Sequence, residues 1–255
     1  NALADLLKKH DNDIAALVIE PTGKVIPKPG FLTEVRRLCD HYGVVLVFDE
    51  VISGFRIDMG GAQAYYNVTP DLAAFGKAMA NGYPISALVG KREIMSKMQD
   101  IFFSATFGGE LSSIAAAIAT ITKLEKTDGI RCMHMLGDRL MKGLNATLSD
   151  VGLGKMIHYT GEAWWPRVAF NDLPIEQSKF LALMRQEYAA QNLLIASGLN
   201  LCLAHDDLQI VDQTLKRAKR AFEALSIAIQ APDPSKFIKG EIATSDFEVR
   251  GHIKA

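Results

Sequence analysis

The stretch "VVLVFDEVISGFR", residues 44–56, joins a strongly apolar run to two adjacent carboxylates. Residues 44–48 are all apolar, which predicts a short strand that is buried on both faces. Asp49 and Glu50 follow at once, and then a turn. A carboxylate at the end of such a strand is typical of two kinds of site. In one it serves a magnesium ion beside a nucleotide, and in the other it faces the protonated nitrogen of an aromatic ring.

The segments around this stretch alternate between strand and helix patterns. Residues 29–43 have apolar side chains at helical spacing, and Gly43 stands where the helix should stop. Strand, helix and strand in this order predict an α/β fold with a mostly parallel sheet, whose ligands bind at the carboxyl ends of the strands. Asp49 and Lys77 both stand at such ends. The predicted strands are 13–21, 44–48, 71–77 and 85–90.

The second half of the chain has a different character. It predicts two turn-rich short strands within 150–170 and mainly helices elsewhere. We therefore expect residues 1–150 to belong to a large ligand-binding domain, 151–230 to form a small C-terminal α+β domain, and 231–255 to be a tail extension. The predicted helices are 111–126, 130–148, 175–192 and 206–230.

Composition excludes several classes of partner. Charged residues make up 22% of the 255 residues and the net charge is -1, so nothing favours capture of nucleic acid or of an anionic membrane. Cys39, Cys132 and Cys202 are far apart and odd in number, which predicts neither a metal site nor a disulfide framework and favours the cytoplasm. The chain lacks an initiator Met and opens in a helical pattern, so we expect a C-terminal portion of a longer protein.

A nucleotide site would need a phosphate loop with the spacing Gly-x-x-x-x-Gly-Lys-Ser/Thr. The nearest match, "GLGKM" at 152–156, has Ser149 at the first Gly position and Met156 where the hydroxyl should be. The segment "GKAMANG", 76–82, also fails. A P-loop ATPase with a Walker B-like Asp49-Glu50 is therefore the weaker alternative, and it stays open because the loop could lie upstream of residue 1.

The segment "FGKAMANGYPISALVG", 75–90, favours the aromatic-ring alternative. Its glycines allow the backbone to approach a ligand closely. Lys77 follows an apolar stretch, and we expect it to lose hydration there, which favours the neutral amine that can form a Schiff base. A lone lysine is usually a surface residue, but a pyridoxal phosphate site needs both a lysine and an acid, and Asp49 supplies the acid.

Three motifs in order carry a family resemblance: "VFDEVISGFR", "FGKAMANGYPISALVGKREIM" and "FSATFGGELSSIAAAIATI". From about residue 13 to about residue 230 the chain resembles the class III aminotransferases of fold type I. It is most similar to the glutamate-1-semialdehyde 2,1-aminomutase branch. The resemblance implies pyridoxal 5'-phosphate as cofactor, transfer of an amino group from an amino donor to a keto or aldehyde acceptor, and a homodimer. It also implies that the family's own-subunit phosphate loop and ring-stacking aromatic residue precede residue 1.

The resemblance assigns roles to four residues. Asp49 would pair with the pyridine nitrogen, and Val51 would press on one face of the ring. Lys77 would hold the cofactor and, once released, carry the proton. Thr106 would reach the cofactor phosphate of the other subunit. Glu50 is interpreted as a structural carboxylate with local partners.

Thr106 also has support from the residues that follow it. Thr106, Gly108 and Gly109 precede a predicted helix, whose free N–H groups favour an anion. By itself, Thr106 could equally be an ordinary helix cap.

Departures from the family pattern leave the substrate open. Ile52 stands where many members have Gln, and "GGE" at 108–110 replaces Gly-Asn-Pro. The "MANGYP" turn favours an aminotransferase over a true aminomutase, which remains the alternative. Trp164, Trp165 and Arg167 could touch a sugar or carboxylate, although core packing is the favoured interpretation. His205 is interpreted as part of a helix start.

Overall fold

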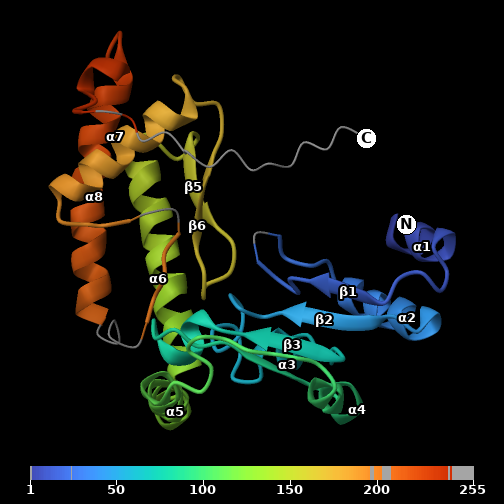
Figure 1. Cartoon of the computed structure of the whole chain (residues 1–255). Coiled ribbons are helices and arrows are strands. Elements are labelled where there is room, and N and C mark those ends of the chain that lie inside the picture. Colours follow the sequence, from blue (N-terminus) through green and yellow to red (C-terminus); the bar gives the residue numbers. More distant parts are fainter. Residues whose placement is uncertain (1, 24, 196–197, 203–207, 241, 243–255) are drawn as a thin grey trace. The chain divides into compact units, whose positions relative to one another are not determined.

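The structure is a computed structural model that describes the chain except for residues 1, 24, 196–197, 203–207, 241 and 243–255 (Figure 1). The chain divides into two compact units, Asn1–His134 and Met135–Ala255, which are described one at a time. The division falls inside helix α6 (Gly129–Asp150). The domain boundary that we expected near residue 150 stays a prediction.

The first unit is built on a four-stranded sheet with the strand order β1-β2-β3-β4 (Figure 1). The first three strands are parallel and β4 is antiparallel to β3, so the predicted mostly parallel α/β sheet is confirmed. The reversal has a simple cause, because the short link from β3 to β4 cannot make the crossover that parallel neighbours need. The strands are β1 (Ala16–Ile19), β2 (Val45–Asp49), β3 (Leu72–Phe75) and β4 (Ala87–Gly90).

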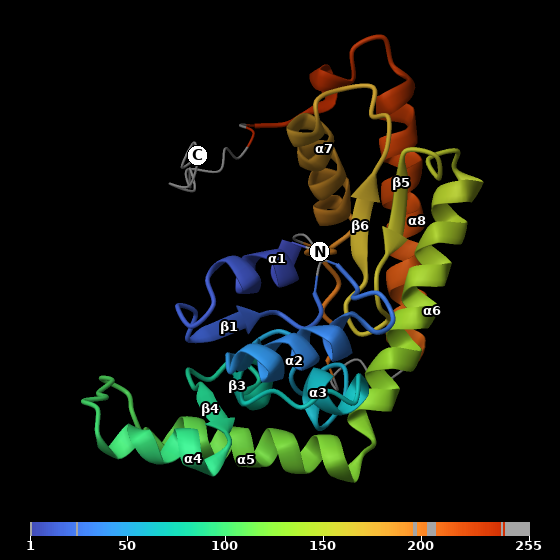
Figure 2. The ribbon, with the colours of Figure 1, turned by 90° about the vertical axis from the view of Figure 1, so that its right-hand side faces the viewer.

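Helices pack along this sheet. Helix α2 packs on β2 and α1 packs on α2, while α5 packs on η1, the turn that follows β3 (Figure 2). In α2 the predicted apolar positions Val35 and Leu38 are buried but Phe31 is 47% exposed, and Gly43 ends the helix in a left-handed conformation (φ 64°) as expected. The helical elements are α1 (Ala2–Lys9), α2 (Phe31–Tyr42), α3 (Gly61–Tyr65), η1 (Lys77–Ala80), α4 (Arg92–Met95), η2 (Ser96–Gln99) and α5 (Leu111–Lys126).

A buried carboxylate joins β2, α2 and the end of β4. Asp71, which immediately precedes β3, accepts hydrogen bonds from Leu46 N at 2.7 Å and Arg36 Nη1 at 2.8 Å. Its second oxygen pairs with Lys91 Nζ at 2.7 Å. Burial alone would raise the pKa of Asp71, but the bonds from Lys91, Leu46 N and Arg36 outweigh it and lower the pKa. Asp71 therefore fixes how β3 starts against β2.

The second unit contains a two-stranded antiparallel sheet and long helices. Its strands β5 (Ile157–Thr160) and β6 (Arg167–Phe170) confirm the two strands predicted within 150–170. Trp164 is 1% exposed, so it packs in the core as predicted, while Arg167 Cζ lies 5.4 Å from the Trp165 ring centroid. The helical elements, besides α6, are α7 (Gln177–Ala190), α8 (Leu208–Gln230) and η4 (Pro234–Phe237).

The described start of the tail lies on α7. Gln186 Nε2 donates to Phe237 O at 3.1 Å, and Lys239 N donates to Gln186 Oε1 at 2.7 Å. The predicted helix start at His205 lies outside the described residues. In the described part of the chain, none of the helices combines the length and the apolar character needed to cross a bilayer.

Replacing Asp71 with Ala should lower the free energy of unfolding by about 3 kcal/mol, because it leaves the Leu46 N–H without its acceptor and leaves Arg36 only the more exposed Asp40. Since the folded pKa is lowered, the stabilisation is present above the unfolded value of 3.8 and is lost as the pH falls through the folded value. Urea unfolding of the full-length protein at neutral and acidic pH measures both effects.

Glu34→Ala is the matched control, because it removes the exposed Glu34–Arg37 pair on α2 and should cost less than about 1 kcal/mol. Equal stability losses for the Asp71 and Glu34 variants at neutral pH would contradict the role of Asp71.

Candidate active site

Two polar side chains stand at the carboxyl ends of neighbouring parallel strands. Asp49 is the last residue of β2 and lies opposite Ala74 of β3. Glu50 N donates to Ala74 O at 2.9 Å, so the two strands stay paired to their ends. Lys77 follows β3 after Gly76. Asp49 and Lys77 therefore lie at the same edge of the sheet, where the sequence placed them.

Val51 comes close to the segment that carries Lys77. A Cβ placed on Gly76 would lie 3.5 Å from Val51 Cγ1, which is ordinary van der Waals contact. Val51 is half-buried, so part of its side chain remains accessible. The structure thus brings Asp49, Val51 and the backbone beside Lys77 together.

Lys77 has an uncommon backbone conformation and an accessible side chain. Its φ is 38°, a left-handed value that non-glycine residues adopt rarely and that is found repeatedly at functional sites. Its side chain is exposed, so the expectation of a dehydrated lysine among apolar neighbours is wrong for this chain. The reason is local, since the turn of η1 begins at Lys77 just beyond the sheet edge, outside the apolar core.

Asp49 is half-buried and has one hydrogen bond, with Val51 N donating to Oδ1 at 3.1 Å. In the part of the chain that the structure describes, neither Asp49 nor Lys77 forms an ion pair with another side chain. Both charged groups are thus available to a ligand. An amine, a carboxylate and an apolar side chain at one edge suit a planar ring that carries a carbonyl group and a protonated nitrogen.

Glu50 is fully buried and organises the loop that follows Asp49. Its carboxylate accepts hydrogen bonds from Ser53 Oγ at 2.9 Å, Gln63 N at 3.2 Å and Gln63 Nε2 at 3.3 Å, and also from Ala62 N. These contacts bear out its interpretation as a structural carboxylate. They tie both ends of the 51–62 loop to the residue beside Asp49, so they hold Val51 near the sheet edge.

Gly61 is the partner of Glu50 that sequence reasoning missed. Its φ is 74°, and a Cβ there would lie 2.5 Å from Glu50 Oε2. The signal in the sequence was the pair Gly60-Gly61 at the start of a short helix, but the buried carboxylate that excludes a side chain there is seen only in the structure.

Thr106 is exposed in a turn before α5, and no contact brings it to Asp49 or Lys77 among the described residues. The helix it precedes does pack on η1, through a cluster of Met79, Ala80 and Ala117. The expectation of free N–H groups at that helix start needs correction. Glu110 accepts hydrogen bonds from two of them, Ser112 N at 2.8 Å and Ser113 N at 2.7 Å, so this carboxylate already occupies that end of the helix.

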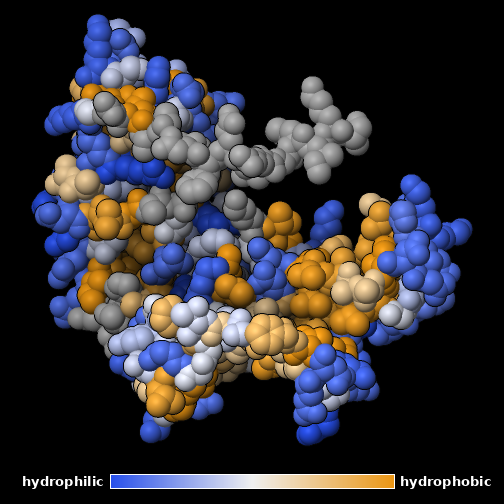
Figure 3. Space-filling model, in the orientation of Figure 1, coloured by the Kyte–Doolittle hydropathy of each residue, from blue (hydrophilic) through white to orange (hydrophobic). Residues whose placement is uncertain are grey.

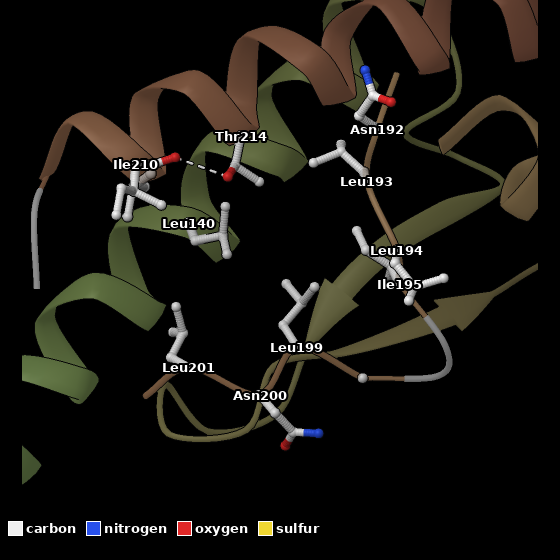
Figure 4. A pocket seen from close by; sticks show the side chains of 12 residues that line it. Leu140, Asn192, Leu193, Leu194, Ile195, Leu199, Asn200, Leu201, Ile210 and Thr214 are labelled. Atoms are coloured by element: carbon white, nitrogen blue, oxygen red, sulfur yellow. Dashed lines mark hydrogen bonds between the residues drawn. The ribbon is translucent and has the colours of Figure 1, made fainter. Parts of the chain in front are cut away.

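Two other kinds of site lack support. In the described residues no group of three His, Cys, Asp or Glu side chains could hold a metal ion. A pocket of about 260 Å³ lies within the second unit, lined mainly by aliphatic side chains of α6, of α8 and of residues 192–195 and 198–201 (Figure 4). The amide groups of Asn192 and Asn200 point away from it, and the Thr214 hydroxyl bonds Ile210 O at 2.8 Å. This pocket therefore presents few polar groups to a ligand.

Comparison with known proteins identifies relatives of the chain. A family model described as "Aminotransferase class-III" matches residues 1–161. A 3-aminobutyryl-CoA aminotransferase from Cloacimonas acidaminovorans is 37% identical over 198 residues, which cover 75% of this chain and 47% of that protein. A glutamate-1-semialdehyde 2,1-aminomutase from Methanococcoides burtonii is 36% identical over 194 residues, 73% of this chain and 46% of that protein. The chain thus spans about half the length of these curated relatives.

Solved structures show the same fold. The FumI protein of Sphingopyxis sp. MTA144, described as a PLP internal aldimine form, matches with a TM-score of 0.81 and 29% identity. The match covers 93% of this chain and 58% of that one. An omega-transaminase from Sphaerobacter thermophilus matches with a TM-score of 0.73 and 26% identity, covering 86% of this chain and 55% of that one. The predicted fold type I architecture is thereby confirmed.

Gly61→Ala tests whether the Glu50 carboxylate fixes the loop beside Asp49. Gly43→Ala is the matched control, because Gly43 also has a left-handed φ, of 64°, yet has nothing within 4 Å of an added Cβ. The control should cost about 1 kcal/mol of stability through its backbone conformation alone. Gly61→Ala should cost about 2 kcal/mol more, because its Cβ displaces the buried carboxylate. Thermal unfolding of the two variants measures the difference, and equal losses would show that Glu50 can move freely.

Proposed function

Because the chain belongs to the class III aminotransferase family, we propose that its protein is a pyridoxal-phosphate-dependent aminotransferase. It moves an amino group from an amino donor to a keto or aldehyde acceptor. The observation that carries this proposal is the placement of Asp49 and Lys77 at the same edge of the sheet, with neither engaged in an ion pair among the described residues. We also place the protein in the cytoplasm.

The residues at this edge fit the cofactor. Pyridoxal phosphate, when bound, supplies an aldehyde that accepts the amino group and a protonated ring that withdraws electrons from the substrate. Asp49 holds the proton on the ring nitrogen, because a carboxylate favours the charged form of a neighbouring base. Val51 would cover one face of the ring. Lys77 Nζ would hold the cofactor and, once released, would carry the proton between the substrate carbon and the cofactor carbon.

Thr106 contributes to the site of a second subunit in this proposal, where its hydroxyl meets the cofactor phosphate. Exposed apolar side chains flank it along the chain: Phe103 is 75% exposed, Phe107 69% and Leu111 79%. Figure 3 shows apolar surface over α5, the helix that follows. Apolar surface of this kind suits burial against a partner, so we propose a homodimer with shared sites.

An intramolecular aminomutase remains the second candidate, because relatives at 36% identity carry that name. An added keto acid distinguishes the two reactions. A transaminase passes the amino group to the added acid, whereas a mutase returns it to the same carbon skeleton. The P-loop ATPase alternative is set aside, because the class III model spans the stretch that suggested it.

Asp49→Asn should slow amino transfer by about a hundredfold or more, because a neutral amide no longer holds the ring proton. The lysine-bound cofactor should remain, since Lys77 is unchanged. Single-turnover absorbance changes with an amino donor measure the rate in the full-length protein. Asp138→Asn is the control, because Asp138 pairs with Lys142 on the surface of α6 and should react at the normal rate. Near-normal turnover by the Asp49 variant would rule out the ring-nitrogen role.

A further inference from the structure

Glu110 connects the turn that carries Thr106 to helix α5. Gly108 N donates to Ala105 O at 3.0 Å, and Glu110 N donates to Phe107 O at 3.2 Å. Residues 105–110 therefore form two consecutive turns, with Thr106 in the first of them. The second turn ends on Glu110, so anything that anchors Glu110 also limits the movement of Thr106.

The side chain of Glu110 is anchored to the helix. Its two oxygens accept separately from Ser112 N at 2.8 Å and Ser113 N at 2.7 Å, and its backbone carbonyl accepts from Ile114 N at 3.3 Å. The polar groups of Ser113 and then Ser112 stabilise the charged form and lower the pKa of Glu110 to about 2. The carboxylate is therefore charged at every pH at which an enzyme of this kind works.

A second glutamate shows that such a bond pattern is not automatic. Glu176 occupies the same position before α7 with similar backbone angles (φ -51°, ψ 137°, against φ -62°, ψ 123° for Glu110), but its side chain makes no capping bond to the helix. It accepts instead from Ser178 Oγ at 2.6 Å. The two glutamates differ in their contacts although they have the same place relative to a helix, so Glu176 is a natural control.

We propose that Glu110 is a positioning residue of the shared cofactor site. By occupying the start of α5 with its own carboxylate, it holds the double turn in the conformation that presents Thr106. The hydroxyl of Thr106, and not the end of the helix, is then the contact that this segment offers to the phosphate. This inference rests on the proposed function, in which Thr106 meets the cofactor phosphate of the partner subunit.

The inference predicts a phosphate-specific effect. The full-length apo-protein is titrated with pyridoxal 5'-phosphate and, separately, with pyridoxal, which lacks the phosphate. Glu110→Ala should weaken pyridoxal phosphate binding by about fivefold to tenfold, the range that loss of a helix cap represents, and leave pyridoxal binding nearly unchanged. Glu110→Asp should restore most of the affinity, because Asp is also an effective cap. Glu176→Ala should bind both compounds normally.

Each other result overturns the inference in a recognisable way. Tighter phosphate-dependent binding by Glu110→Ala would show that the carboxylate competes with the phosphate for the helix start. An equal loss of affinity for pyridoxal phosphate and for pyridoxal would indicate a general structural role. Unchanged affinity for both would show that the double turn does not need Glu110. Failure of the unchanged protein to bind pyridoxal phosphate would refute the proposed function itself, and the inference with it.

Discussion

The pairing of β2 with β3 is the constraint on which the rest of the site depends. Two groups fix this pairing at its opposite ends. At the amino end Asp71 bonds Leu46 N, and at the carboxyl end Glu50 N bonds Ala74 O. If the register of β2 against β3 shifted by one residue, Asp49 would point to the other face of the sheet and be separated from Lys77. The positions of the two proposed catalytic groups are thus set by bonds that neither of them makes.

Three carboxylates near this sheet show how surroundings determine role. The Glu50 carboxylate is fully buried and accepts hydrogen bonds from four groups, so its role is to organise the loop around it. Glu110 is half-buried and engaged by two N–H groups, which makes it part of a helix start. Asp49 is half-buried with a single bond and keeps acceptor capacity for a ligand. Partial burial with spare acceptor capacity is what a group needs to hold a proton on a bound ring.

Much of this arrangement could be predicted because it depends on local pattern. The apolar run at 44–48 predicts β2 almost to the residue, and Gly43 predicts the end of α2. The placement of Asp49 and Lys77 followed from strand ends alone. The exposure of Lys77 and the capping by Glu110 could not be predicted in this way. The exposure of Lys77 depends on which side chains cover the turn that it begins. The capping depends on the side-chain rotamer that brings the Glu110 carboxylate onto its own helix, and Glu176, at the same position before α7, makes no such bond.

The proposed function requires that Lys77 be the residue that holds the cofactor. Borohydride reduction of the full-length protein in the presence of pyridoxal phosphate would fix the cofactor covalently to its lysine, and peptide mass spectrometry would locate it. We expect a single modified residue, Lys77, at the carboxyl edge of the sheet beside Asp49. Modification at a different lysine, or no modification in a protein that retains the cofactor, would contradict it.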